Sequence, residues 1–289
     1  MAEYKIKEVE SLTGIKAHTL RIWEKRYGIL VPERSETQIR TYSDDELTFL
    51  LNISLLNKNG IKISKIANLS KGEISKKVWE LHSSSVLETS GEHFILALIE
   101  MDEKLFSNTL NSLIAEVGLE AAFMNHLIPF LERIGVMFLV GSIIPAQEHF
   151  ISNLIRQKVI SEIDKLPIPN ENRHKVLLFL PEHEWHELGL LLYQFLLRKN
   201  GISTFYFGQS LPYESLITSI NLLHPEVIIS SWLTSVDNTF IKNYFAKLQK
   251  DAPNALICAG GAQIKVHLTH LPKGIIAIEK AIEILNVVR

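Results

Sequence analysis

Cysteine is almost missing from the 289 residues: the chain has one, Cys258, so no internal disulfide can form. Cys258 lies in an apolar run and is expected to be a buried small hydrophobe rather than a reactive thiol. The sequence also lacks a Ser-His-Asp set, a P-loop and a Cys/His zinc cluster. We therefore expect no catalytic activity.

Long apolar runs are missing as well, because none reaches the length that spans a bilayer. The first residues lack the apolar core of a signal peptide, so the protein is expected in the cytoplasm, with no membrane partner. Hydrophobic residues make up 46% and charged residues 21%, a composition typical of globular chains. The length is enough for two or three domains.

The small net charge of −2 conceals an uneven distribution. Residues 1–77 contain 14 Lys+Arg against 10 Asp+Glu, and the rest of the chain contains 16 against 22. A basic N-terminal module on an acidic body suits a protein that meets phosphates at one end. An excess of this size also arises by ordinary scatter, so charge alone does not identify the partner.

Residues 1–77 have the pattern of a helix-turn-helix. A short helix with an apolar face is expected from Tyr4 and is stopped at Thr13-Gly14. Residues 16–19 open a second helix, which should turn apolar positions inward and basic positions outward. The inward positions are Leu20, Ile22 and Trp23, and the outward ones are Arg21, Lys25 and Arg26.

A polar stretch that ends at Arg40-Thr41-Tyr42 follows and fits a wing, a small hairpin that lies along the DNA backbone. Ser43 then caps a third helix, with Glu46 three residues on for a capping box, and Gly60 ends that helix. Residues 61–66 begin a fourth short helix.

This segment resembles the DNA-binding domain of the MerR family, in register through Thr19-Leu20-Arg21-Ile22-Trp23-Glu24, Tyr27-Gly28 and Arg40-Thr41-Tyr42-Ser43. The resemblance implies a winged helix-turn-helix on double-stranded promoter or operator DNA. It implies that these residues face the groove or its flanking phosphates: Lys16, His18, Thr19, Arg21, Arg26, Tyr27, Arg34, Arg40 and Tyr42. The alternative is a solvated helix face without a DNA target.

Residues 78–90, with three serines near the middle, are interpreted as a linker. From 91 to 166 the pattern is almost unbroken helix with a pause at Pro129, and apolar residues recur at helical spacing. Helices of this size predict a four-helix bundle.

Residues 172–289 alternate apolar strands with helices. The expected strands cover residues 176–180, 203–207, 227–229, 255–258 and 275–278. Continuous apolar strands separated by helices indicate a parallel, doubly wound, Rossmann-like sheet. The fold class is therefore multi-domain: a winged helix-turn-helix, a helical bundle and an α/β domain.

Three polar motifs fall at the carboxyl ends of these strands, where such sheets bind ligands. His186 follows the first strand, Ser231-Trp232-Leu233 the third and Gly260-Gly261 the fourth. A cobalamin requires a nitrogen ligand for cobalt, a hydroxyl near its nucleotide tail, and glycines where the backbone passes close to the tail. Glu184 can accept the other ring N–H of His186 and fix its tautomer.

These motifs resemble the cobalamin-binding domain of methionine synthase, mutases and corrinoid proteins, whose signature is Asp-x-His-x-x-Gly, Ser-x-Leu and Gly-Gly. Glu184 replaces the Asp, as in the light-responsive CarH-like group of MerR regulators. The resemblance implies His186 as the cobalt ligand, and adenosylcobalamin or methylcobalamin as the cofactor. The implied contacts are Glu184, His186, Gly189, Ser231, Leu233, Gly260 and Gly261. A fold relative that kept the motifs but binds no cofactor is the alternative.

The bundle departs from the CarH-like pattern, in which a Trp, nine residues and then Glu-His line a cavity above the cobalt. Phe138 stands at the Trp position and Leu139 where the photoreceptors have a histidine, whereas Glu148 and His149 are kept. Phe lacks the indole N–H and Leu cannot ligate cobalt. The cofactor site is therefore expected whole below the cobalt and altered above it. A hydrogen-bonded Glu148–His149 pair between bundle helices is the plain alternative.

Together the two resemblances predict a transcription regulator. Its DNA affinity or self-association, as a dimer or tetramer, would respond to bound cobalamin, with light as a candidate signal. A corrinoid carrier in methyl transfer is less favoured, because a carrier has no need of a groove-reading helix. A regulator with a cofactor-free sensor is the other alternative.

Overall fold

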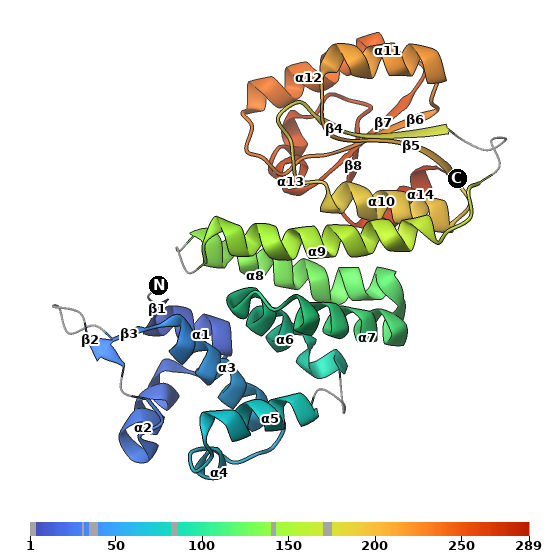
Figure 1. Cartoon of the computed structure of the whole chain (residues 1–289). Coiled ribbons are helices and arrows are strands. Elements are labelled where there is room, and N and C mark those ends of the chain that lie inside the picture. Colours follow the sequence, from blue (N-terminus) through green and yellow to red (C-terminus); the bar gives the residue numbers. More distant parts are fainter. Residues whose placement is uncertain are drawn as a thin grey trace. The chain divides into compact units, whose positions relative to one another are not determined.

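The structure, a computed structural model, describes residues 4–30, 32–34, 40–81, 86–139, 143–169 and 175–288. Contacts within the chain divide it into two compact units, Met1–Leu154 and Ile155–Arg289. The boundary falls inside one long helix, α9 (Pro145–Asp164), which Figure 1 shows as a continuous ribbon. The second half of α9 therefore groups with the sheet, although the sequence assigns all of α9 to the bundle.

The helix-turn-helix in the first unit depends on two left-handed helix ends. Helix α1 (Ile6–Thr13) ends at Gly14, whose φ is 73°, and α2 (Ala17–Tyr27) ends at Gly28, whose φ is 60°. Glycine adopts this conformation without the Cβ clash that other residues meet, so each helix stops where the sequence predicts.

The wing is a three-stranded sheet with β3 at its centre. Strand β3 (Arg40–Tyr42) pairs antiparallel with β2 (Glu33–Arg34) and with β1 (Tyr4–Lys5). The prediction that the first helix starts at Tyr4 is wrong, because Tyr4 lies opposite Tyr42 in this ladder and both side chains are buried. The wing is thus tied to the first residues that the structure describes.

Two buried hydrogen bonds fix the turn between α1 and α2. The Ser54 hydroxyl, on α3 (Asp44–Lys58), donates to the Thr13 carbonyl at 2.7 Å. The Thr13 hydroxyl accepts the Ile15 amide at 3.1 Å. An unmatched polar group at such a buried position would cost about 1–3 kcal/mol, so these bonds hold α2 in a set orientation on α3.

Helix α3 begins with the predicted capping box, in which Ser43 and Glu46 exchange side-chain and backbone bonds at 2.8 and 3.3 Å. Helix α4 (Ile63–Ile66) matches the predicted fourth helix. Helices α5 (Lys71–Leu81) and α6 (Val86–Glu100) extend into the range 78–90 that the sequence assigns to a linker.

The bundle continues from α6 through α7 (Glu103–Ala122), a π-helical turn η1 (Phe123–Leu127), α8 (Ile128–Leu139) and α9. The helix is interrupted at Gly118, where φ is 80° and ψ is 161°. The prediction of a pause at Pro129 is wrong. Pro129 is the second residue of α8 and follows the π-helical turn, whose wider spacing accommodates a residue without an N–H.

Three aromatic rings mark the bundle core. The ring centroid of Phe94 lies 4.9 Å from that of Phe106 and 5.1 Å from that of Phe130. The helical run Glu103–Gly135, which carries two of these rings, is long and apolar enough to pass for a membrane span. By that criterion the expectation of no span-length apolar run is wrong, but the core helix of a soluble bundle passes the same test.

The second unit is a five-stranded parallel sheet in the order β5-β4-β6-β7-β8. Its strands are β4 (Lys175–Pro181), β5 (Ser203–Leu211), β6 (Val227–Ser231), β7 (Leu256–Gly260) and β8 (Ile276–Ile278). Its helices include α10 (Leu188–Lys199), α11 (Tyr213–Leu223), α12 (Asn238–Asp251), α13 (Ala262–Val266) and α14 (Ile284–Val287), with single turns η2 (Leu268–His270) and η3 (Ala281–Glu283).

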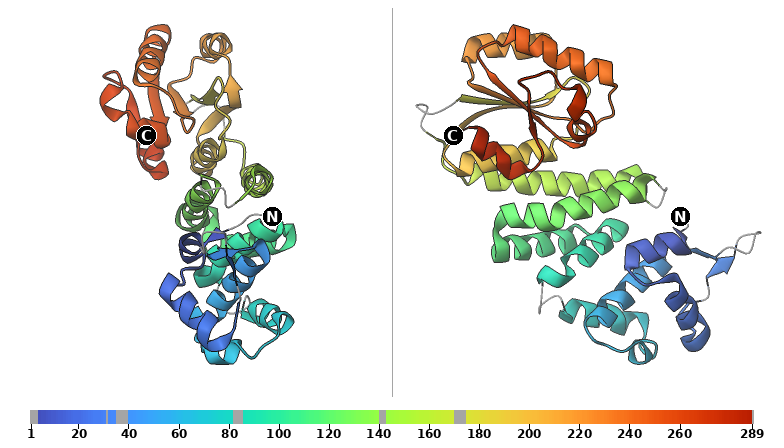
Figure 2. Two further views of the ribbon diagram at one scale, coloured as in Figure 1. Left: turned by 90° about the vertical axis from the view of Figure 1, so that its left-hand side faces the viewer. Right: turned by 180° about the vertical axis from the view of Figure 1, so that it is seen from behind.

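Helices cover both faces of this sheet. Figures 1 and 2 show α11 and α12 on one face and α10 with α14 on the other. The chain turns back at β4, with β5 on one side of it and β6 on the other, so the predicted doubly wound topology is confirmed. The loops after β4, β6 and β7 consequently open at one edge, which is where such sheets hold ligands.

Candidate functional site

The exposed face of α2 carries the side chains that the sequence assigns to DNA. Arg21, Lys25 and Arg26 are exposed, whereas Leu20 and Trp23 are buried against the body. Ile22, predicted inward, is 52% exposed, so that assignment is wrong. An apolar side chain among basic ones suits a groove, where thymine methyl groups offer apolar contact.

The remaining predicted contacts on this helix also lie at the surface. The Lys16 ammonium pairs with Glu10 at 3.1 Å and is largely exposed. The side chains of His18 and Thr19 are 3.3 Å apart, and the Arg26 guanidinium stacks over the Tyr27 ring. The side chain of Arg34 lies outside the described part of the structure.

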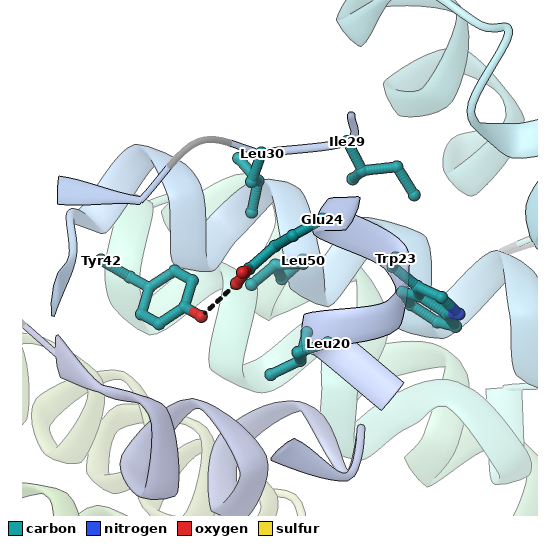
Figure 3. Close-up of a pocket in the computed structure, with 7 residues that line it drawn as sticks. All are labelled: Leu20, Trp23, Glu24, Ile29, Leu30, Tyr42 and Leu50. Carbon is teal, nitrogen blue, oxygen red and sulfur yellow. Dashed lines mark hydrogen bonds between the residues drawn. The ribbon is translucent and has the colours of Figure 1, made fainter. Parts of the chain in front are cut away.

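Glu24 joins the recognition helix to the wing. Its carboxylate accepts Arg40 Nε at 2.9 Å and the Tyr42 hydroxyl at 2.6 Å, beside a small pocket that Leu20, Leu30 and Leu50 help to line (Figure 3). Burial and the bond to Glu24 raise the pKa of Tyr42, so its hydroxyl remains a donor.

This arrangement changes the roles expected for two wing residues. Tyr42 was assigned to the DNA face, but it is 1% exposed and its hydroxyl is used inside the domain. The Arg40 side chain is one-quarter exposed and its Nε is paired with Glu24. Tyr42 therefore supports the wing from within, and any contact of Arg40 with DNA would use the part of its guanidinium that Glu24 does not hold.

The second candidate site is the loop between β4 and α10. The imidazole of His186 is 60% exposed, and its Nδ1 lies 2.7 Å from Glu184 Oε1. The side chain of Glu184 is 3% exposed. A carboxylate at Nδ1 favours the tautomer with hydrogen on that nitrogen and keeps the lone pair on Nε2, the atom that would ligate a metal.

Glu184 is itself held by the loop after β6. Its carboxylate accepts the amides of Leu233 at 2.7 Å and Thr234 at 2.6 Å, and the Thr234 hydroxyl at 3.1 Å. Burial alone would raise the pKa of Glu184, but the bonds from His186, Thr234 and Leu233 outweigh it and lower the pKa to about 2. Glu184 is thus a carboxylate at any physiological pH, and it draws two strand ends together.

The loops that Glu184 joins carry two exposed apolar side chains. Trp185 is 59% exposed and Leu233 is 42% exposed. Strand β5 secures the outer side of the histidine loop, because Gln209 donates to the Trp185 carbonyl at 2.8 Å and Ser210 donates to the Glu184 carbonyl at 3.0 Å. An exposed nitrogen ligand with exposed apolar side chains in the same loops suits a flat macrocycle that carries a metal.

The signature glycines lie where side chains or backbone cross closely. A Cβ on Gly189 would lie 3.4 Å from the hydroxyl oxygen of Ser231, and one on Gly260 would lie 2.1 Å from the Tyr193 hydroxyl. A Cβ on Gly261, whose φ is 98°, would lie 2.3 Å from the Trp232 carbonyl oxygen. These glycines therefore have reasons within the fold itself, besides any passage for a nucleotide tail.

The residues expected above the cobalt lie on α8 and α9 in the first unit. Phe138 is 47% exposed, and the side chain of Leu139 lies outside the described part. His149 is largely exposed and its Nδ1 lies 2.9 Å from Glu148 Oε2. The pair sits within one helix, so the alternative of a bond between bundle helices does not describe it.

Sequence reasoning missed three residues of these sites. Glu24 and Thr234 organise their neighbours, and Tyr193 fills the space beside Gly260, where burial raises its pKa to about 12. Thr234 follows the Ser-x-Leu motif directly, so a search for loop donors to Glu184 would have found it. Neither Glu24 nor Tyr193 has a local signal, because their partners are distant in the chain.

Two known families match the helical parts of the chain. The family described as "MerR HTH family regulatory protein" matches residues 4–73, and the one described as "B12 binding domain" matches residues 91–160. The chain therefore combines a region that matches the MerR helix-turn-helix family with a region that matches a B12-binding domain.

Along nearly its whole length the chain is similar to two repressors of Myxococcus xanthus. It is 29% identical over 277 residues to "HTH-type transcriptional repressor CarH", covering 92% of each chain. It is 28% identical over 271 residues to "HTH-type transcriptional repressor CarA", covering 91% of this chain and 88% of the relative. The regulator is thus CarH-like in its domain order.

The fold alone is shared with a solved corrinoid protein. The monomethylamine corrinoid protein of Methanosarcina barkeri superposes with a TM-score of 0.56 at 15% identity, covering 66% of this chain and 92% of that one. The helices and the parallel sheet therefore form an architecture known from corrinoid proteins.

The two roles on the DNA face can be separated by salt dependence. Arg21→Ala should flatten the slope of log K against log[salt] by about 0.9, the amount expected for one lost phosphate contact. Glu24→Gln should weaken binding to all sequences without changing the slope, because it loosens the wing and removes no phosphate contact. Fluorescence anisotropy with labelled operator DNA measures both. Equal slopes for wild type and Arg21→Ala would refute the assignment of this face.

The crossing at Gly261 should be required for folding. Gly261→Ala is expected to lower the free energy of unfolding by about 2–4 kcal/mol, because the new Cβ meets backbone that cannot move aside. Gly274 is the matched control: its φ is also 98°, but a Cβ there would meet only the Gln249 side-chain amide at 3.0 Å. Gly274→Ala should cost about 1 kcal/mol. Urea denaturation measures the free energy of unfolding of both variants, and equal losses of stability would contradict the close backbone contact at Gly261.

Proposed function

We propose that this regulator binds operator DNA through the exposed face of α2 and the wing, and that a cobalamin held at His186 controls this binding or the protein's self-association. The observation that carries the proposal is the exposed imidazole whose Nδ1 is bonded to the buried carboxylate of Glu184. The regulator acts in the cytoplasm, where its DNA lies, and like its named relatives it is a repressor.

The residues at the sheet edge fit the group that the B12-binding match implies. When bound, a cobalamin supplies a cobalt that takes a nitrogen ligand and, in its alkyl forms, a cobalt–carbon bond that light breaks. His186 would hold the cobalt through Nε2, and Glu184 keeps the imidazole in the required tautomer and raises its basicity. Trp185 and Leu233 supply apolar surface for the macrocycle.

Specificity for the tail would come from the other side of the same edge. Ser231, the last residue of β6, is buried beside Gly189, and Gly260, the last residue of β7, lies against Tyr193. These residues line the start of α10 and the ends of two central strands, where the family signature locates the nucleotide. Adenosylcobalamin and methylcobalamin share that tail, so this side does not discriminate between them.

The role of the lower ligand is tested by His186→Ala. This variant should lose cobalamin uptake, because cobalt then has no protein nitrogen, while the sheet stays folded since the loop lies outside its core. The control is His183→Asn, which removes the other imidazole of the loop at a position with φ of 68°, a conformation that Asn tolerates. Visible absorbance titration with hydroxocobalamin measures uptake. Absence of uptake by the wild type would favour the cofactor-free sensor.

The response to light should differ from that of photoreceptors with a second histidine. Leu139 offers no ligand, so illumination of protein loaded with adenosylcobalamin should leave one protein imidazole on cobalt, with a weak effect on assembly. His149, exposed and bonded to Glu148, is the remaining candidate in that region. Absorbance spectra and the mass in solution of the loaded protein, recorded in the dark and after illumination, test this expectation. A spectrum with two imidazoles that persists in His149→Ala, with full dissociation, would overturn this expectation.

A further inference from the structure

The residue after the imidazole carries a second buried carboxylate. The side chain of Glu187 is 4% exposed. It forms an ion pair with Arg156 Nε and accepts the Tyr206 hydroxyl at 2.7 Å. Arg156 lies on α9, Tyr206 on β5, and Glu187 immediately precedes α10. Three different elements therefore meet at one carboxylate.

An irregularity in β5 brings Tyr206 to this carboxylate. The register with β4 shifts after Tyr206, which pairs with Leu178, because Gly208 rather than Phe207 pairs with the next β4 residue. Such bulges redirect side chains, and they recur beside functional sites. Gly208 has a φ of 69°, and a Cβ there would lie 3.6 Å from Glu187 Oε2. Glycine suits this position because its φ is positive and because a Cβ would lie only 3.3 Å from the Tyr206 ring.

The charge of Glu187 needs both partners. A carboxylate removed from water is costly unless a cation and hydrogen-bond donors match it. Arginine is charged at every accessible pH, and burial together with Glu187 raises the pKa of Tyr206, so the phenol keeps its proton and donates. Without Arg156, the Tyr206 hydroxyl would be the one donor left to the charge within the described part of the chain, and the loop would move to expose the carboxylate.

The imidazole therefore stands between two anchored carboxylates. Glu184 ties the loop to the segment after β6, and Glu187 ties it to α9 and β5. We propose that Arg156 and Tyr206 are positioning residues which, through Glu187, fix the loop that presents His186 to cobalt. The proposal rests on the proposed function for the identity of the bound metal. It also makes α9, which carries Glu148 and His149 about two turns before Arg156, part of the support of the lower ligand.

The first test compares two substitutions on α9 that remove the same charge. Arg156→Met should lower the affinity for hydroxocobalamin about tenfold, and Arg156→Lys should restore part of it, because the ammonium keeps the charge but not the planar donor. Lys158→Met is the control, since Lys158 pairs with Glu162 at 2.8 Å on the same helix and should leave the affinity unchanged. Tyr206→Phe should fall between Arg156→Met and wild type.

The second readout identifies the cobalt ligand directly. In ¹⁵N-labelled protein loaded with unlabelled cob(II)alamin, the electron paramagnetic resonance spectrum distinguishes a protein nitrogen from the cofactor's own base. Wild type and Lys158→Met should show the labelled nitrogen alone, whereas Arg156→Met should show both populations. A loss of general stability would weaken uptake without exchanging the ligand. An unchanged spectrum and affinity in Arg156→Met would overturn the inference while the proposed function stands.

Hydrogen exchange of the full chain, without added corrinoid, tests the anchor independently of the cofactor. The amides of residues 184–187 should exchange faster in Arg156→Met than in Lys158→Met, and equal rates would refute the anchor. If wild type takes up no cobalamin but this difference is seen, the proposed function fails and the positioning of the loop remains. The two failures are therefore distinguishable.

Discussion

The buried carboxylate of Glu184 is the constraint on which the sheet edge depends. Nearly all of its side chain is removed from water, so its oxygens must be matched by donors, and these come from Leu233, Thr234 and His186. The dependence runs in one direction: β6 places its loop, the loop places the carboxylate, and the carboxylate orients the imidazole. The protein thereby bears the cost of ordering the ligand within its own fold, which is what preorganisation requires.

The DNA-binding domain uses the same device at Glu24. There a carboxylate on the recognition helix holds an arginine and a tyrosine of the wing, so the two parts that would grip DNA cannot move independently. Arg40 and Tyr42 have the composition of DNA contacts, and a resemblance assigns them so. The folded structure decides which partners they have: the largely buried carboxylate of Glu24 accepts the Tyr42 hydroxyl and pairs with part of the Arg40 guanidinium.

These cases show what the sequence could predict and where it failed. Apolar runs and the rule for parallel sheets predicted every strand of the second unit and the common edge of its motifs, because both depend on local pattern. The sequence did not predict the pairing of Tyr4 with Tyr42, because a strand of two residues is too short to show alternation of apolar and polar residues and its partner strand is distant in the chain. The pause predicted at Pro129 was wrong for a different reason. A proline normally breaks a helix because its ring clashes with the preceding turn, but here a π-helical turn precedes Pro129 and gives the ring more room. Glu187 occupies an unspecified position of the Asp-x-His-x-x-Gly motif, so the motif gives it no role, but its bonds to Arg156 and Tyr206 hold the loop in place.

One departure from the CarH-like pattern, Phe138, falls where the structure tolerates change. Phe138 is half exposed and lies outside the aromatic core of Phe94, Phe106 and Phe130, so its identity alters what the bundle offers to a ligand with little effect on packing. Glu184 and Glu187 have less freedom, because removing Glu184 would leave the amides of Leu233 and Thr234 unmatched, and removing Glu187 would leave Arg156 and the Tyr206 hydroxyl without their acceptor. The Phe138 position can thus change with little effect on packing, whereas the loop that carries His186 is tied to the residues that build the sheet edge.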